Sequence, residues 1–252
     1  MKNKNFKLYS QYYDLIYQEK DYSKEIDYIF NLINKFGKGG KIHLLDLGSG
    51  TGNHGYLMAE KGFEVTGIEK SSEMVAISNK RNHRNFKSYI GDIVSFSLPE
   101  KFNVITALFH VISYINNNHD LDKMLNNVYT HLETDGIFIF DVWYSPAVYT
   151  LKPETRIKRI ISENIELTRI AEPVLHSIKN IVDVNYQIII KDTNSGELQE
   201  FKELHPMRHF TIPEVELYAE KHNFEIILTE EFMTGKTPSE NTWGVNFILR
   251  KN

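Results

Sequence analysis

A glycine-rich loop constrains the fold of this chain more than any other feature of its sequence. The apolar run from Ile42 to Leu47 predicts a buried parallel strand, which leads directly into Gly48-Ser49-Gly50-Thr51-Gly52. A helix near 53–61 is expected to follow. Alternating glycines permit unusual backbone angles and leave no side chain to block a ligand, and the helix start adds unpaired amide donors. The segment therefore predicts a strand–loop–helix unit that binds a ligand with its backbone.

Two nucleotide-binding patterns compete for this loop. The dinucleotide fingerprint Gly-x-Gly-x-x-Gly fits only from Gly50 to Gly55, which places it late, after an extra Gly-Ser pair. The phosphate-binding P-loop is excluded, because no Gly-Lys-Ser/Thr sequence follows. The pattern Asp46-x-Gly48-x-Gly50-x-Gly52 instead resembles motif I of class I S-adenosylmethionine-dependent methyltransferases. Taken alone, the glycines are also compatible with a structural turn.

Two acidic residues follow at the ends of the next two predicted strands. The strand at 63–68 ends beside Glu69, about 20 residues past the glycines, where a carboxylate can accept both ribose hydroxyls of a nucleoside. The strand at 86–90 ends at Gly91-Asp92, which is placed to accept a hydrogen bond from an adenine amino group, with Ile93 beside the ring. Ligands of open α/β sheets bind at the carboxyl ends of strands. The ordered loop and carboxylates therefore favour a nucleoside cofactor over a structural turn.

The order of predicted strands and helices changes near residue 150. Before it, strands alternate with helices, which is typical of right-handed βαβ units and a mostly parallel sheet. After it, residues 156–171, 178–192 and 199–210 are β-prone with no intervening helix, which predicts an antiparallel insert. The other expected elements are helices at 21–34, 71–81, 119–132 and 213–223 and strands at 104–108, 137–142, 225–232 and 243–250.

The predicted fold class is therefore α/β. We expect a Rossmann-like class I methyltransferase sheet, mostly parallel with an antiparallel last strand, and a β-rich antiparallel insert between strand 5 and the last helix. The expected parts are a helical N-terminal lid at 1–40, a cofactor-binding core at 41–150, the insert at 151–211, and the end of the core sheet at 212–252. We expect the insert to lie on the substrate side and to govern substrate choice.

The segment from Leu108 to Ile115 follows the fourth strand and, in the methyltransferase fold, borders the methyl group. His110 is a candidate to orient or deprotonate the nucleophile, because histidine titrates near neutrality. Its alternative role is to pack beside the cofactor. Tyr114 is expected to hydrogen-bond the substrate, or else to belong to the core.

A second candidate segment, Phe140 to Tyr144, ends the fifth strand. Asp141 stands where a carboxylate attracts an amine. Trp143 and Tyr144 are aromatic residues suited to a sugar face or to a cation. The alternative interpretation is an ordinary aromatic strand end.

A narrower resemblance connects several of these segments. They are similar to bacterial N,N-dimethyltransferases that act on nucleotide-linked amino sugars. The similar segments are Tyr13-Asp14-Leu15-Ile16-Tyr17, Lys20-Asp21-Tyr22, Phe109 to Tyr114, Asp141-x-Trp143-Tyr144, the insert, and Phe201-Lys202-Glu203 with Phe210-Thr211. The resemblance implies that the Tyr-rich N-terminal helix closes over the cofactor and that the insert helps to form the sugar pocket. Pro238 to Trp243 departs from the family's Gly-rich ending with an arginine, which puts a sugar-phosphate contact there in doubt.

The motifs and the resemblance together imply a set of site residues. The catalytic candidates are His110, Tyr114 and Asp141. The cofactor-binding candidates are Tyr13, Lys20, Asp46, Gly48, Gly50, Gly52, Glu69, Lys70, Asp92, Ile93 and Leu108, with Tyr13 and Lys20 near the methionine end. The substrate-contact candidates are Tyr17, Trp143, Tyr144, Glu203, His205 and Arg208. No metal is expected, because His205 and His209 would need a third ligand and no His-Glu-x-x-His motif occurs.

Composition narrows the possible partners. The formal net charge of -4 argues against a general nucleic-acid binder, and the Asn/Asp-Pro-Pro-Tyr/Phe motif of base methylation is missing after the fourth strand. The absence of cysteine excludes disulfides and thiolate catalysis. No apolar run approaches the roughly 20 residues that span a bilayer, and the polar N-terminus lacks a signal-peptide core. A cytoplasmic protein is therefore expected.

The predicted function is S-adenosylmethionine-dependent methylation of a small molecule. Amine N-methylation, as on a nucleotide-linked amino sugar, ranks ahead of O-methylation because of Asp141 and its aromatic neighbours. A non-catalytic cofactor-binding module and an NAD-dependent dehydrogenase are the rival interpretations. We expect a monomer or homodimer without nucleic-acid or membrane partners.

Overall fold

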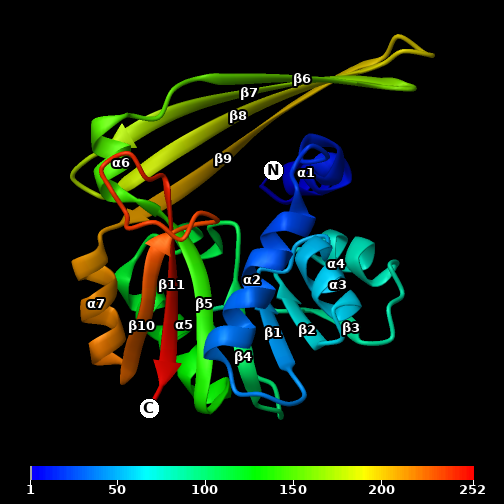
Figure 1. Ribbon diagram of the computed structural model, residues 1–252. Helices are drawn as coiled ribbons and strands as arrows, with labels where there is room; N and C mark the ends of the chain where they lie inside the picture. The colour runs from blue at the N-terminus through cyan, green and yellow to red at the C-terminus, as the bar shows by residue number, and fades with distance from the viewer. Residues whose placement is uncertain (1) are drawn as a thin grey trace.

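A core sheet with helices on both faces carries a second, antiparallel sheet above it (Figure 1). The structure, a computed structural model, describes residues 2–252 and the side chains from Tyr9 onward. The helices are α1 (Lys2–Ile16), α2 (Tyr22–Phe36), α3 (Asn53–Glu60), α4 (Ser72–Asn79), α5 (Asn118–His131), α6 (Ser145–Thr150) and α7 (Ile212–Lys221), with the 3-10 helix η1 (Val111–Tyr114). The core strands are β1 (His43–Leu47), β2 (Glu64–Glu69), β3 (Phe86–Ile90), β4 (Phe102–Ala107), β5 (Leu132–Tyr144), β10 (Phe224–Glu231) and β11 (Gly244–Lys251). The insert strands are β6 (Arg156–Ser162), β7 (Ile165–His176), β8 (Ile181–Asp192) and β9 (Leu198–Phe210).

The core strands follow the order β3-β2-β1-β4-β5, and these five are parallel. β11 pairs with β5 in antiparallel register, and β10 lies antiparallel beside β11. This arrangement confirms the predicted mostly parallel sheet with an antiparallel last strand. The glycine loop and the ends of β2, β3 and β4 consequently meet at one edge of the sheet.

Strand β5 shows why this sheet has helices on both faces. Ile137 and Ile139 belong to the apolar cluster that includes α2 and α3, whereas Phe138 and Phe140 belong to the cluster that includes α5 and α7. Alternate residues of a strand point to opposite faces, so a continuous apolar run needs cover on both sides. Burial of each such side chain stabilises the fold by about 1.5–3 kcal/mol. The two helix layers therefore hold the strand ends in fixed positions.

The insert is an antiparallel sheet in the chain order β6, β7, β8 and β9. It is hydrogen-bonded to the core, because Trp143 and Tyr144 of β5 pair with His209 and Phe210 of β9. Helix α1 contacts both β9 and α4, and it lies between the insert sheet and the core in Figure 1. The start of the chain therefore covers the ends of the core strands.

Some elements differ from the predicted bounds. β5 begins at Leu132 rather than near 137, and Asp135 turns within it with a φ of 58°. The short helix α6 is absent from the prediction; Pro146 stands in its first turn, where the missing amide donor carries no cost. Within residues 2–252 no helix is both long enough and apolar enough to cross a membrane.

Candidate active site

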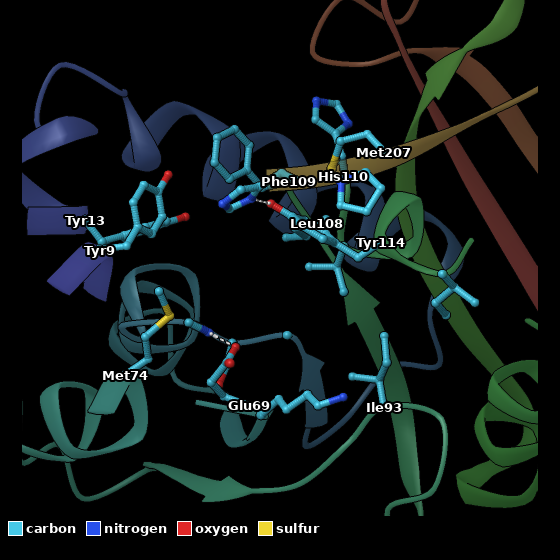
Figure 2. A pocket seen from close by; sticks show the side chains of 18 of the residues that line it. Tyr9, Tyr13, Glu69, Met74, Ile93, Leu108, Phe109, His110, Tyr114 and Met207 are labelled. Carbon is cyan, nitrogen blue, oxygen red and sulfur yellow. Dashed lines mark hydrogen bonds between the residues drawn. The ribbon is translucent and has the colours of Figure 1, made fainter. Parts of the chain in front are cut away.

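A cavity of about 740 Å³ lies where the ends of the core strands meet α1 and the insert sheet. Figure 2 shows Glu69 and Ile93 on its core side, with Tyr13 and His110 across the open space from them. Residues of η1, β8 and β9 contribute further parts of the wall. A cavity of this size, placed at the carboxyl ends of parallel strands, is the typical ligand site of an open α/β sheet.

The three glycines of the loop have different surroundings. Gly48, Gly50 and Gly52 have φ values of 67°, 54° and 82°, which favour glycine. A Cβ atom on Gly48 would lie 2.6 Å from Val111, and one on Gly52 would lie 2.8 Å from Phe86. A Cβ atom on Gly50 would have no neighbour nearer than 4.0 Å. Gly48 and Gly50 line the cavity, whereas Gly52 lies outside it and lets the loop pack closely against β3.

Both predicted acidic strand ends line the cavity. Glu69 accepts hydrogen bonds from the amides of Gly50 (3.0 Å) and Ser71 (2.8 Å), which fix its carboxylate beside the glycine loop. Burial raises the pKa of Glu69, and these amides offset only part of the effect. Burial also disfavours the charge of Asp92, but Lys70 Nζ donates to it at 2.8 Å and the pKa of this carboxyl is lowered. The carboxylate of Asp92 therefore stays ionised at neutral pH.

The apolar candidates Ile93 and Leu108 also line the cavity, but Asp46 does not. Asp46 is 2% exposed and lies in β1, where one carboxyl oxygen accepts the hydroxyl of Thr106 at 3.0 Å. Its other oxygen has no partner among the described residues. Burial raises the pKa of Asp46 to about 6. Asp46 therefore links β1 to β4, and its contact with a cofactor stays a prediction.

Asp141 stabilises an unusual turn directly after β4. Phe109 and His110 have φ values of 67° and 61°, which are uncommon for residues with side chains. Asp141 Oδ1 accepts the amide of Phe109 at 2.7 Å, and Oδ2 accepts that of His110 at 3.2 Å. Oδ2 also lies 2.7 Å from His110 Nδ1, but out of line for a hydrogen bond, so this contact is electrostatic. Although burial disfavours the charge of Asp141, the His110 side chain and the two amides lower its pKa.

Asp141 lies behind the wall of the cavity. It is 1% exposed and does not line the cavity, whereas His110 does. Its direct contact with an amine stays a prediction, and the contacts seen here are those of a carboxylate that holds the His110 turn from behind.

Four tyrosines near the start of the chain line the cavity: Tyr9, Tyr13, Tyr17 and Tyr22. The ring centroids of Tyr13 and Tyr17 are 4.8 Å apart, and the hydroxyl groups of Tyr9 and Tyr17 are 3.3 Å apart. Tyr17 also meets Phe109 edge-on at 5.2 Å. Tyr9 is not among the predicted site residues, although residues four apart lie on one helix face and the spacing of Tyr13 and Tyr17 also points to Tyr9.

Lys20, a predicted cofactor contact, lies outside the cavity lining. Its ammonium group pairs with Glu25 and lies 4.1 Å from the centre of the Phe109 ring. Glu25 also contacts Nε2 of His54 at 2.8 Å. Burial lowers the pKa of Lys20, and Glu25 partly restores it. Lys20 therefore supports the Phe109 turn from behind.

Buried polar groups follow one another along the wall formed by η1 and β9. The Tyr114 hydroxyl lies 2.9 Å from Nδ1 of His205, and Nε2 of His205 lies 2.9 Å from a carboxylate oxygen of Glu203. The side chains of His205 and Glu203 are 6% and 5% exposed. Tyr114 and His205 line the cavity, and Glu203 stands behind them.

The remaining substrate candidates are separated by the fold. Trp143 lines the cavity, with its ring 6.1 Å from that of His110. Tyr144 packs against the core cluster, and Arg208 pairs with Glu214 of α7 at 2.5 Å, so neither lines the cavity. Their predicted contact with substrate therefore has no support in the cavity lining.

Several lining residues escape prediction from the sequence. They include Met74 of α4, Tyr186 of β8, and Met207 of β9. No motif or spacing marks them, because the pairing of β8 with β9 and the position of α4 under α1 bring them to the cavity.

Comparison with known proteins agrees with this geometry. The model of a methyltransferase domain family matches residues 38–203. The dTDP-3-amino-3,6-dideoxy-alpha-D-glucopyranose N,N-dimethyltransferase of Streptomyces fradiae is 31% identical over 143 residues. That match covers 56% of this chain and 55% of the Streptomyces protein.

Solved structures share the fold over nearly the whole chain. A S-adenosylmethionine-dependent methyltransferase from Clostridium acetobutylicum has a TM-score of 0.81 at 22% identity, covering 96% of each chain. CalS10, an amino pentose methyltransferase from Micromonospora echinaspora solved with S-adenosylmethionine bound, has a TM-score of 0.76 at 19% identity, covering 95% of this chain and 96% of its own. Because the family match spans more than half of the sequence and includes the glycine loop and both acidic strand ends, the chain belongs to the methyltransferase domain family.

Proposed function

We propose that this chain is an S-adenosylmethionine-dependent methyltransferase that methylates an amine of a small molecule, such as the amino group of a nucleotide-linked sugar. The observation that carries the proposal is the cavity of about 740 Å³, which has Gly50, Glu69 and Asp92 on one side and His110 with the α1 tyrosines on the other. The similarity to an amino-sugar N,N-dimethyltransferase supports the choice of an amine.

The core side of the cavity fits this cofactor. Glu69 has further lone pairs beyond its two amide bonds and would accept the ribose hydroxyls. Asp92 would accept the adenine amino group, with Ile93 against the ring. Gly50 leaves its backbone open to the amino-acid arm, since no neighbour would crowd even a Cβ atom there. When bound, the cofactor supplies a methyl group activated by a sulfonium sulfur.

Several residues of this chain would bind and orient the reactants and exclude water. Tyr17, Phe109 and Trp143 present aromatic rings to the cavity, and ring faces attract ammonium groups. The turn held by Asp141 places His110 among them. Positioning of a nucleophile near its methyl donor, with water excluded, accounts for much of the acceleration of such a reaction.

We also propose roles for the parts of the chain. Residues 1–40 act as a lid and residues 151–211 as the substrate side, around a core of 41–150 that 212–252 completes. The cavity lining supports this division, because α1 supplies Tyr9 and Tyr13 and the insert supplies Tyr186 and Met207.

Calorimetric titration tests the cofactor. We expect S-adenosylmethionine and S-adenosylhomocysteine to bind and NAD not to bind. NAD binding with no response to the other two ligands would overturn the proposal. Binding of S-adenosylmethionine without transfer to any acceptor would instead favour a cofactor-binding module.

A mass-spectrometric screen tests the acceptor. It compares dTDP-amino sugars, free amines and hydroxylated small molecules, and we expect a gain of methyl groups on amines. The position of His110 at the cavity also allows O-methylation, which needs a base more urgently than amine methylation does. Loss of turnover in His110→Ala with a hydroxylated acceptor, and no turnover of amines, would favour that second function.

A further inference from the structure

We infer that Glu203, His205 and Tyr114 form a proton relay that removes a proton from the methyl acceptor, an inference that rests on the proposed function. The three groups are joined by two contacts of 2.9 Å. They run from a buried carboxylate behind the wall to a hydroxyl group in the wall of the cavity.

The chemistry of the three groups fixes the direction of their hydrogen bonds. An ionised carboxylate only accepts, so Glu203 requires the proton of neutral His205 to be on Nε2. Nδ1 is then an acceptor, and the hydroxyl group of Tyr114 donates to it. The phenol oxygen of Tyr114 can then accept a hydrogen bond from a donor in the cavity through its lone pairs. Tyr114 is 49% exposed and lines that space, and its hydroxyl group is held by Nδ1 of His205.

The groups around His205 leave the histidine as the exchangeable base. Tyr9 of α1 lies 5.4 Å from its ring and Tyr186 of β8 lies 4.9 Å away, and Arg169 of β7 stacks over Tyr186. Burial raises the pKa of Tyr9 and that of Tyr186, so both rings stay neutral near pH 7. Among these neighbours the charged groups are Glu203, which stabilises an imidazolium, and the more distant Arg169.

The relay performs a step that an amine acceptor requires. Alkyl amines are protonated near pH 7, and the nitrogen lone pair is free only after a proton leaves. That proton moves to the oxygen of Tyr114 while the proton of Tyr114 moves to Nδ1 of His205. The imidazolium so formed is neutralised by Glu203. After the product leaves, the proton returns by the reverse path to water in the cavity.

A further histidine–carboxylate pair beside the cavity, His110 with Asp141, is less suited to this task. Both oxygens of Asp141 accept backbone amides, and His110 Nδ1 approaches the carboxylate out of line. That pair supports the backbone turn, whereas Glu203 and His205 contact one another through side-chain atoms aimed toward Tyr114.

The first test uses nuclear magnetic resonance on the ligand-free protein labelled with ¹⁵N-histidine. The His205 signals are identified by their loss in His205→Gln. We expect a neutral ring protonated on Nε2, and a ring protonated on Nδ1 would overturn the relay. This measurement does not depend on turnover, and calorimetry with S-adenosylmethionine tests the proposed function separately.

The second test compares the pH dependence of kcat for an amine that is methylated in the screen. Tyr114→Phe keeps the ring and is expected to lower kcat by about 100-fold. Glu203→Gln is expected to lower the plateau of kcat and to move its acidic limb to lower pH, because the imidazolium loses its neutralising carboxylate. A purely structural role would lower kcat at every pH without moving the limb, and that result would overturn the inference.

A matched control lies on the same sheet. His176 and Asp183 form another histidine–carboxylate pair at 2.9 Å, away from the cavity lining. Asp183→Asn is expected to leave both the plateau and the acidic limb of the profile unchanged. A shift in this control equal to that of Glu203→Gln would show a general charge effect and would overturn the relay.

Discussion

The buried carboxyl group of Asp46 makes stability depend on pH in a way that can be measured without a substrate. Burial raises its pKa from the ordinary 3.8 to about 6, and the Thr106 hydroxyl offsets only part of this. The folded chain therefore holds this proton more tightly than the unfolded chain does. The corresponding stability is fully present below about pH 4 and is lost as the pH rises through about 6.

The expected magnitude follows from the two pKa values. Their difference of about two pH units, at about 1.4 kcal/mol for each, corresponds to about 3 kcal/mol lost by the wild type between pH 4 and pH 7. Asp46→Asn has no such proton, and its oxygen still accepts the Thr106 hydroxyl. Its amide N–H groups stay unpaired at a cost of about 1–3 kcal/mol, but this cost does not depend on pH. The free energy of unfolding of the variant, relative to wild type, should thus rise by about 3 kcal/mol over this range.

Urea unfolding at closely spaced pH values, followed by circular dichroism, measures this difference. Asp27→Asn is the control, because Asp27 is an exposed carboxylate paired with Lys61, and exposed pairs are worth about 0–1 kcal/mol. Its difference from wild type should not show the same slope. Parallel stability curves for Asp46→Asn and the wild type would refute the reasoning.

Four further substitutions probe the cavity and the turn behind it. Gly48→Ala should lower the free energy of unfolding by at least about 1–2 kcal/mol, because Gly48 has a backbone conformation that disfavours a side chain. The new Cβ atom would also lie 2.6 Å from Val111, so adding Val111→Ala should recover the part of the lost stability that this contact causes. If Val111→Ala recovers no stability, the contact is not a cause of the loss. Glu69→Gln should weaken the binding of S-adenosylmethionine about tenfold or more in calorimetry, since hydrogen bonds to charged groups contribute about 1.5–3 kcal/mol, and unchanged affinity would contradict its proposed role. Asp141→Asn should destabilise the fold by about 1.5–3 kcal/mol in urea unfolding at pH 7, because an amide cannot accept through both of its polar atoms. A variant as stable as wild type would show that this turn does not need the carboxylate.

The fold could be predicted because the pattern of apolar residues within each short segment indicates the element that the segment forms. The strand run before the glycine loop and the apolar stretch around Phe138 each need cover on two faces, which a parallel sheet between helices provides. The sequence places the glycines, Glu69 and Asp92 each at the end of a strand, which predicts that they meet at one edge of the sheet. All of them except Gly52 line the cavity. The resemblance to class I methyltransferases is confirmed by the family match.

The direction of individual side chains was less predictable. Asp141 shares the face of Ile137 and Ile139, which packs toward α2 and α3, so its carboxylate lies behind the cavity wall. The guanidinium group of Arg208 pairs with Glu214 in the helix that follows it, and the ammonium group of Lys20 pairs with Glu25. Such pairings form only when separate elements pack, and no pattern within one segment reveals them.

The short ladder between β5 and β9 has a consequence for protein engineering. Trp143 and Tyr144 fix β9 against the core through His209 and Phe210, whereas the β6–β7 and β8–β9 turns of the insert lie at its far end (Figure 1). We therefore expect that these two turns can be exchanged with those of related chains, or lengthened, without disturbing the end of the insert that meets the core. A transplant that shifts β9 by one residue would instead turn every side chain of that strand to the opposite face. A chimaera must therefore keep the number of β9 residues between the cavity and the pairing of β9 with β5.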